Sequence, residues 1–130
     1  MPKYLHPDVI DNGLQHIIDQ AAGNVDMRLL SAYTQGDSYA TVTGNAIATI
    51  NMIVGDFTLG DSGSFDRKLT VAAKTGAASS SASSPDLHVA LIDATNSKVL
   101  AVTDETSEQD ITAGNPLTIP TFDIVVNQPV

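Results

Sequence analysis

The sequence contains no cysteine and no tryptophan, and it has only three tyrosines and three phenylalanines in 130 residues. Without cysteine the chain can form neither disulfides nor thiolate metal sites, and it has no cysteine nucleophile. This composition fits a protein that is made in a reducing cytoplasm. The shortage of aromatic rings also argues against a surface that stacks sugar rings, because such surfaces are built from aromatic side chains.

Positive charge is equally scarce. Six Lys and Arg residues stand against fifteen Asp and Glu residues, which gives a net charge of -9. An acidic chain repels phosphate backbones, so we expect no nucleic-acid partner, whereas contact with a basic protein surface is allowed. No stretch approaches the ~20 apolar residues of a membrane span, and the first residues lack an apolar signal core, so we expect no membrane contact.

The length predicts one domain, residues 1–130, with a helical N-terminal segment at residues 1–24. Pro7 suits the first position of a helix and Gly23 suits its end. Between them the apolar residues recur at the spacing of an amphipathic helix. They are Ile10, Leu14, Ile17, Ile18 and Ala21.

The rest of the chain, residues 25–130, is predicted to be β-rich. Residues 34–54 are compatible with either a short helix or a loop and a strand, and the Ser/Ala-rich residues 75–85 predict a flexible loop. The fold class is therefore mainly β or α+β: an antiparallel β-sandwich or barrel-like domain with an N-terminal amphipathic helix. Strands are expected at residues 25–33, 56–59, 67–74, 87–92, 98–104 and 117–126, the last interrupted by Pro120.

One tetrapeptide, Gly60-Asp61-Ser62-Gly63, has the letters that surround the nucleophilic serine of trypsin-like proteases. That chemistry needs a histidine base and an orienting aspartate, both of which precede the serine in such enzymes. The two histidines that precede Ser62 both lie in or beside the predicted helix. We therefore predict that Ser62 belongs to a turn between two strands, and that the protein is not an enzyme and has no catalytic residue.

The spacing of the His, Asp and Gly residues does not indicate a metal or cofactor site either. The histidines are isolated, and His88 in its predicted central strand is expected to be a hydrogen-bonded core residue. Asp56, Asp61 and Asp66 recur at intervals of five but lack the dense oxygen ligands of a calcium loop. No Gly-rich loop leads from a strand into a helix to hold a phosphate. We expect no cofactor and no metal.

Four stretches together resemble a group of small tailed-phage virion proteins of the head decoration, or capsid cement, type. They read PKYLHPDVIDNGLQHI, DFTLGDSGSFDRKLTVAAKTG, LHVALIDATNSKVLAVT and ITAGNPLTIPTFDIVV. The resemblance implies a non-enzymatic protein that binds the outer shell of the major capsid protein, self-associates as a dimer or trimer and stabilises the head. It also implies synthesis in the host cytoplasm and a final location on the capsid exterior.

The amphipathic helix either packs on its own sheet or docks on a neighbouring subunit, since its pattern records only that one face is buried. Under the docking hypothesis the partner-binding residues are Tyr4, Leu5, Val9, Ile10, Leu14 and Ile17. Two other functions stay open. One is a tail, connector or fibre-associated role in the virion, and the other is a surface- or carbohydrate-binding module.

Overall fold

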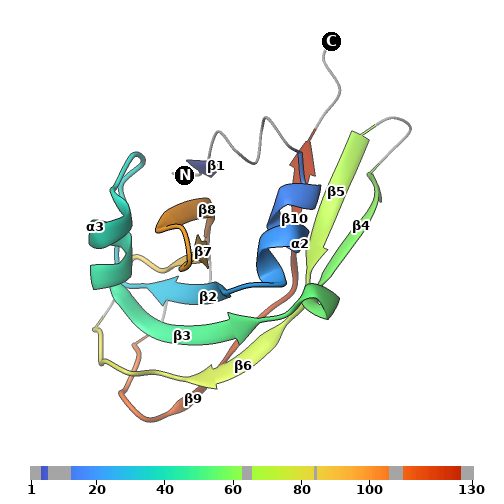
Figure 1. The fold of residues 1–130 in the computed structure, drawn as a ribbon. Helices are drawn as coiled ribbons and strands as arrows, with labels where there is room; N and C mark the ends of the chain where they lie inside the picture. The colour runs from blue at the N-terminus through green and yellow to red at the C-terminus, as the bar shows by residue number, and fades with distance from the viewer. Residues whose placement is uncertain (1–3, 6–12, 63–65, 84, 106–109, 127–130) are drawn as a thin grey trace.

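A computed structural model describes residues 4–5, 13–62, 66–83, 85–105 and 110–126 of the chain (Figure 1). Every strand pairing within these residues is antiparallel, and the sheets pack together in a sandwich-like arrangement. The predicted fold class, mainly β with antiparallel sheets, is confirmed. Among the helices described, none combines the length and the apolarity that a membrane crossing requires.

Three sheets make up this fold. A five-stranded sheet has the order β1-β8-β7-β2-β3, a three-stranded sheet has the order β10-β5-β4, and a two-stranded sheet pairs β6 with β9. The bounds in the first sheet are β1 Tyr4–Leu5, β2 Val25–Leu30, β3 Ala46–Met52, β7 His88–Asp93 and β8 Lys98–Asp104. The others are β4 Phe57–Ser62, β5 Asp66–Val71, β6 Lys74–Ala77, β9 Pro116–Ile119 and β10 Phe122–Val126, with helices α2 Gln15–Ala21 and α3 Tyr39–Gly44 and the 3-10 turn η1 Val54–Asp56.

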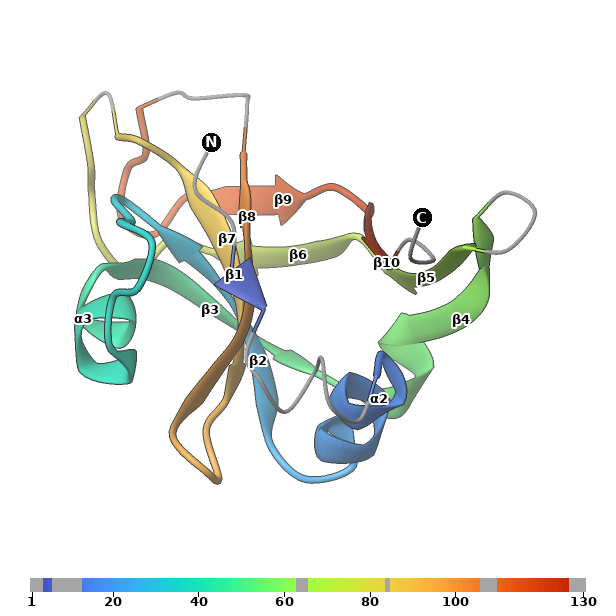
Figure 2. The same ribbon diagram turned by 90° about the horizontal axis from the view of Figure 1, so that it is seen from above.

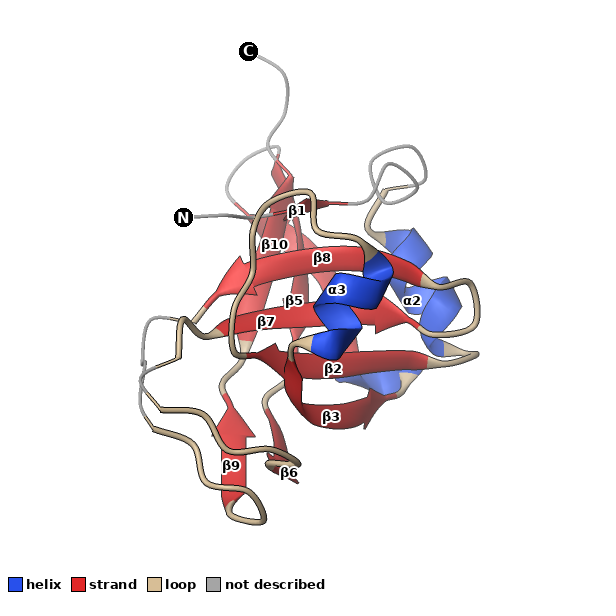
Figure 3. Ribbon diagram, turned by 90° about the vertical axis from the view of Figure 1, so that its left-hand side faces the viewer, coloured by secondary structure: helices blue, strands red, loops and turns tan. Residues whose placement is uncertain are grey.

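Both faces of the five-stranded sheet are buried, which explains why β7 is apolar along nearly its whole length. One face packs against α2 and against side chains of the two smaller sheets. The opposite face packs against α3, with Val42 of that helix fully buried (Figure 3). A strand with a helix or sheet on each side has no solvent face, so it does not alternate between apolar and polar residues.

Helix α2 is shorter than the apolar stripe indicated. It begins at Gln15, just after Gly13, whose φ of +73° lies in the left-handed region and cannot belong to an α-helix. Tyr4 and Leu5, which the sequence assigned to the helical segment, form β1 instead and pair with Val102 and Ala101 of β8. Residues 6–12, including the start predicted at Pro7, lie outside the described residues.

The segment that the sequence left open, residues 34–54, contains both of the alternatives. Ser38 caps α3 by accepting a hydrogen bond from the Thr41 N–H at 3.2 Å, and β3 follows directly after that helix. The predicted β4–β5 hairpin is also present, but Ser62 is the last residue of β4 and pairs with Asp66, so the prediction that it belongs to the turn is corrected. Residues 63–65 lie outside the described residues.

From β5 onward the described residues form one long antiparallel ribbon, which we define as residues 66–83, 85–105 and 110–126. Its two arms pair in almost constant register: Val71 lies opposite Phe122, Lys74 opposite Ile119, and Ala82 opposite Ile111. The β7–β8 hairpin forms its tip. The Ser/Ala-rich segment predicted as a flexible loop is thus structured at its start, because residues 75–77 belong to β6 and Ala78 is buried.

Candidate functional site

The structure places the predicted partner-binding residues in three different situations. Leu14 and Ile17 are 6% and 0% exposed and pack in the chain's own core, so their side chains form no open docking surface. This corrects the docking hypothesis for these two and agrees with the alternative that the helix packs on its own sheet. Tyr4 and Leu5 are held in β1 by pairing with β8. Val9 and Ile10 lie outside the described residues.

A more accessible apolar surface lies on β10, an edge strand that the described residues pair on one side only, with β5. Val125 and Val126 near its end are 43% and 44% exposed, whereas Phe122 and Ile124 turn toward the core. Figure 2 shows that the three-stranded sheet extends away from the five-stranded sheet. We call Val125, Val126 and the outer edge of β10 the β10 edge.

The outward face of the same sheet carries an ion pair. Asp123 of β10 accepts a hydrogen bond from the Thr70 hydroxyl at 2.8 Å, and the Lys68 Nζ lies 3.4 Å from its other carboxylate oxygen. The Thr70 hydrogen bond holds the pKa of Asp123 below its ordinary value. Partial burial acts in the opposite direction, and Lys68 adds to the lowering. Asp123 thus keeps its negative charge on β10, where Lys68 partly balances it.

Asp56 anchors the turn that leads into β4. Its carboxylate accepts a hydrogen bond from the Ile53 N–H at 2.8 Å and contacts the Lys74 Nζ at 3.0 Å. Burial opposes ionisation of this carboxyl group, but the Ile53 N–H and the Lys74 ammonium together outweigh it and keep the pKa of Asp56 below its ordinary value. The pair ties η1 to the first residue of β6.

Replacing Asp56 with asparagine should lower the free energy of unfolding by about 1–2 kcal/mol at neutral pH, because it removes a charge-assisted hydrogen bond. A lowered pKa in the folded state means that this stabilisation is present above the ordinary value of 3.8 and is lost as the pH falls through the folded-state pKa. Urea unfolding of wild type and variant at neutral and acidic pH measures the difference. The difference in stability between wild type and Asp56→Asn should disappear in acid, and a difference independent of pH would contradict the ion pair. Asp19→Asn, on the exposed side of α2, is the control and should change stability little.

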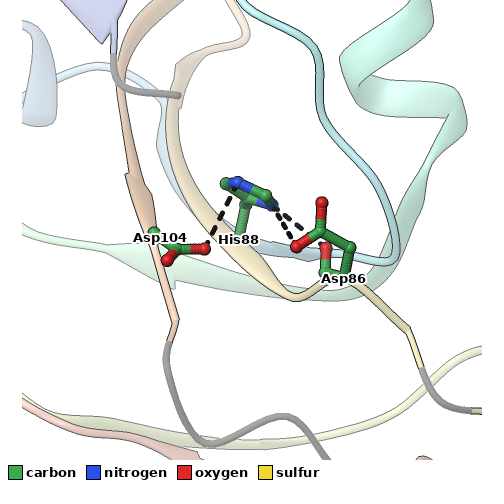
Figure 4. Close-up of side chains that lie close together, drawn as sticks. All are labelled: Asp86, His88 and Asp104. Carbon is green, nitrogen blue, oxygen red and sulfur yellow. Dashed lines mark hydrogen bonds and ion pairs between the residues drawn. The ribbon is translucent and has the colours of Figure 1, made fainter. Parts of the chain in front are cut away.

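A separate group of side chains meets at the open end of the β7–β8 hairpin (Figure 4). His88 begins β7, Asp104 ends β8 directly opposite it, and Asp86 lies two residues before His88. The side chain of His88 is completely buried, that of Asp104 is 12% exposed and that of Asp86 is 61% exposed. One potential ligand atom from each residue lies within 4.8 Å of the other two. We call these three residues the His88 cluster.

The two ring nitrogens of His88 face different partners. Nδ1 lies 3.0 Å from the backbone carbonyl oxygen of Asp86, and Nε2 lies 3.4 Å from the Oδ1 atom of Asp104. A carbonyl oxygen can only accept a hydrogen bond, so Nδ1 carries a proton and donates it. Nε2 has no hydrogen-bond partner among the described residues. The ring also packs against the buried Tyr33 ring, with the centroids 5.5 Å apart.

A cavity of about 580 Å³ lies beside the ribbon. Leu29, Leu87 and residues 115–120 form much of its lining, and Glu105 and Asp110 contribute carboxylates. The lining mixes apolar and polar residues, and the two acidic residues disfavour an anion there.

No protein-family model, curated protein or solved structure matches this chain. Function must therefore be inferred from the β10 edge, the His88 cluster and the sequence itself.

The sequence correctly indicated that His88 is a core residue. It did not, however, predict that Asp86 and Asp104 lie beside the His88 ring. The predicted hairpin could have indicated this, because counting residue pairs outward from its turn places residue 88 opposite a residue near the end of β8. A β-bulge changes the result of that count. Ile92 pairs with Val99 but Leu91 pairs with Ala101, so Leu100 is an extra residue in β8. If the register set at Ile92 and Val99 continued without the bulge, Thr103 rather than Asp104 would lie opposite His88.

Proposed function

We propose that this protein is a non-enzymatic virion structural protein that binds the outer capsid shell as a decoration, or cement, protein. The sequence resemblance to small phage head proteins supplies the class of partner. The observation that carries a binding role is the β10 edge, where no described residue pairs with the outer side of the strand and two adjacent valines are each more than two-fifths exposed. Natural proteins usually protect such edges, so an open apolar one is a candidate for pairing with another chain.

Strand addition to the β10 edge would combine two sources of affinity. The outer backbone groups of β10 would pair with an extended segment of the major capsid protein. The two exposed valines point to opposite faces of the sheet, so each would be partly covered by a neighbouring side chain of the added strand. Completing the burial of one valine contributes roughly 1 kcal/mol, since only part of its surface is still exposed. Each copy would therefore bind modestly on its own.

Many copies on one shell would make modest contacts effective. A protein that bridges neighbouring capsid subunits links them, so that rupture of the shell requires several contacts to break together. We propose that the protein also self-associates as a dimer or trimer, which would multiply the contacts per particle. The net charge of -9 favours a basic surface on the shell as the docking area.

The double substitution Val125→Asp with Val126→Asp should reduce binding to shells at least about tenfold, because it places two charges where apolar surface would be buried. The measurement is co-sedimentation of the purified chain with shells assembled from the major capsid protein of the same genome. Ile53→Asp is the matched control, since Ile53 is 58% exposed but lies outside β10. Unchanged binding by the double variant would overturn the β10 edge as the contact, and equal loss in the control would show non-specific apolar adhesion.

Counting copies in the virion distinguishes the decoration role from the other virion roles. Quantitative mass spectrometry should find on the order of hundreds of copies per particle, as expected for a contact that acts by multivalency. Immunogold labelling should place them over the whole shell. A handful of copies at one vertex would overturn the decoration role and favour a tail, connector or fibre-associated component.

A further inference from the structure

We propose that the His88 cluster binds a divalent transition-metal ion, zinc in the first instance, between Nε2 of His88 and the carboxylates of Asp104 and Asp86. This inference is independent of capsid binding. Its structural consequence would be to tie the segment before β7 to the end of β8, closing the open end of the hairpin.

The first observation is electronic. Because Nδ1 of His88 donates its proton to the Asp86 carbonyl, any lone pair of the ring is on Nε2. That lone pair faces a carboxylate oxygen of Asp104 at 3.4 Å, inside a region where the His88 side chain is completely buried. Two electron-rich atoms facing each other out of water repel unless a cation lies between them. Nε2 is thus a buried nitrogen with no hydrogen-bond partner among the described residues, and a cation bound between it and Asp104 would relieve this repulsion.

The second observation is geometric. Zinc bonds to histidine nitrogen and carboxylate oxygen are about 2.0–2.2 Å long, so adjacent ligands of a tetrahedral ion lie roughly 3.3–3.5 Å apart. The separation of Nε2 from the Asp104 Oδ1 is 3.4 Å, which already matches this spacing. Asp86 is exposed, and its Oδ1 atom lies 3.9 Å from Nδ1 rather than beside Nε2. Its ligand atom lies within 4.8 Å of that of Asp104, so rotation of the Asp86 side chain toward Nε2 would complete a three-residue site open to one water molecule.

The arrangement around His88 also has the outer hydrogen bond that metal-binding histidines use. Donation from Nδ1 to a backbone carbonyl fixes the ring orientation and leaves Nε2 as the metal ligand. An imidazole ligand beside two carboxylates favours zinc over calcium or magnesium, which prefer oxygen ligands alone. The net charge of -9 further attracts a cation.

The test is isothermal titration calorimetry of the full, tag-free chain with zinc chloride after treatment with a chelator. We expect one zinc ion per chain and a higher melting temperature in the presence of zinc. Asp86→Asn retains the backbone carbonyl and changes an exposed side chain, so the protein should fold normally while zinc affinity falls at least about tenfold. Asp104→Asn should abolish binding.

His16→Gln is the matched control. His16 lies in α2, and its Nε2 is also buried without a hydrogen-bond partner among the described residues, but no carboxylate cluster includes it. Zinc affinity in this variant should stay unchanged. The proposal is overturned if wild type does not bind zinc, which would mean that a proton on Nε2 balances Asp104. It is also overturned if Asp86→Asn binds as well as wild type, or if His16→Gln removes the binding.

Discussion

Replacing Ile17 with alanine should lower the free energy of unfolding by about 3 kcal/mol, close to the centre of the range for large-to-small substitutions in cores. Ile17 is completely buried between α2 and the sheets. The helix has only seven residues, so its intrinsic stability in water is negligible and packing must hold it in place. Urea unfolding followed by circular dichroism measures the change.

Gln15→Ala on the exposed side of the same helix is the control for Ile17→Ala, and it should change stability by no more than about 0.5 kcal/mol. Comparison of the two variants also distinguishes the two hypotheses for the apolar face of α2, which are packing on its own sheet and docking on a neighbouring subunit. Suppose that Ile17→Ala leaves stability intact but weakens binding to capsid shells. That result would contradict the packing described here and restore Ile17 as a docking residue.

Gly76→Ala should destabilise the protein by about 1–3 kcal/mol through overpacking. A Cβ atom built on Gly76 would lie 2.8 Å from Cγ1 and 2.9 Å from Cδ1 of Ile50, closer than carbon atoms approach without displacement. The substitution would therefore push β6 away from β3. Thermal or urea unfolding measures the loss, and Gly60→Ala is the control because its new Cβ would meet no atom within 4 Å.

A double-mutant cycle tests whether Ile50 is the cause of the Gly76→Ala penalty. In an Ile50→Ala background the space around Gly76 opens, so most of the penalty should disappear as a coupling energy between the two sites. Equal penalties in both backgrounds would show that the glycine is required for another reason. No penalty in wild type would mean that Ile50 moves aside freely.

The hydrophobic pattern predicted the class of fold because burial leaves a direct record in the sequence. The apolar run from Leu87 to Ile92 indicated a central strand, and β7 occupies that position between β8 and β2. Pro120 was expected to separate two strands, and it lies between β9 and β10. Such features depend on neighbouring residues only, so one sequence is enough to find them.

Features that depend on exact register or on a single backbone conformation were not predictable in the same way. The bulge at Leu100 is invisible in composition, because an extra leucine in a strand buried on both faces leaves the apolar pattern unchanged. It nevertheless determines that Asp104, and not Thr103, meets His88. The helix predicted from Pro7 to Gly23 includes Gly13, whereas the left-handed conformation of Gly13 places it before the first helical residue.

The near-constant register of the ribbon affects how the chain can reach its native state. Val71 and Phe122 are far apart in sequence, and closing a loop becomes more costly by about 0.6 kcal/mol for each doubling of its length. The pairings in the ribbon are nested, however: β7 with β8, then β6 with β9, then β5 with β10. Once the tip has formed, each further pair closes only the short stretch left by the one before. A sheet that joins distant parts of the chain can thus assemble by local steps, zipping outward from the hairpin to the exposed edge.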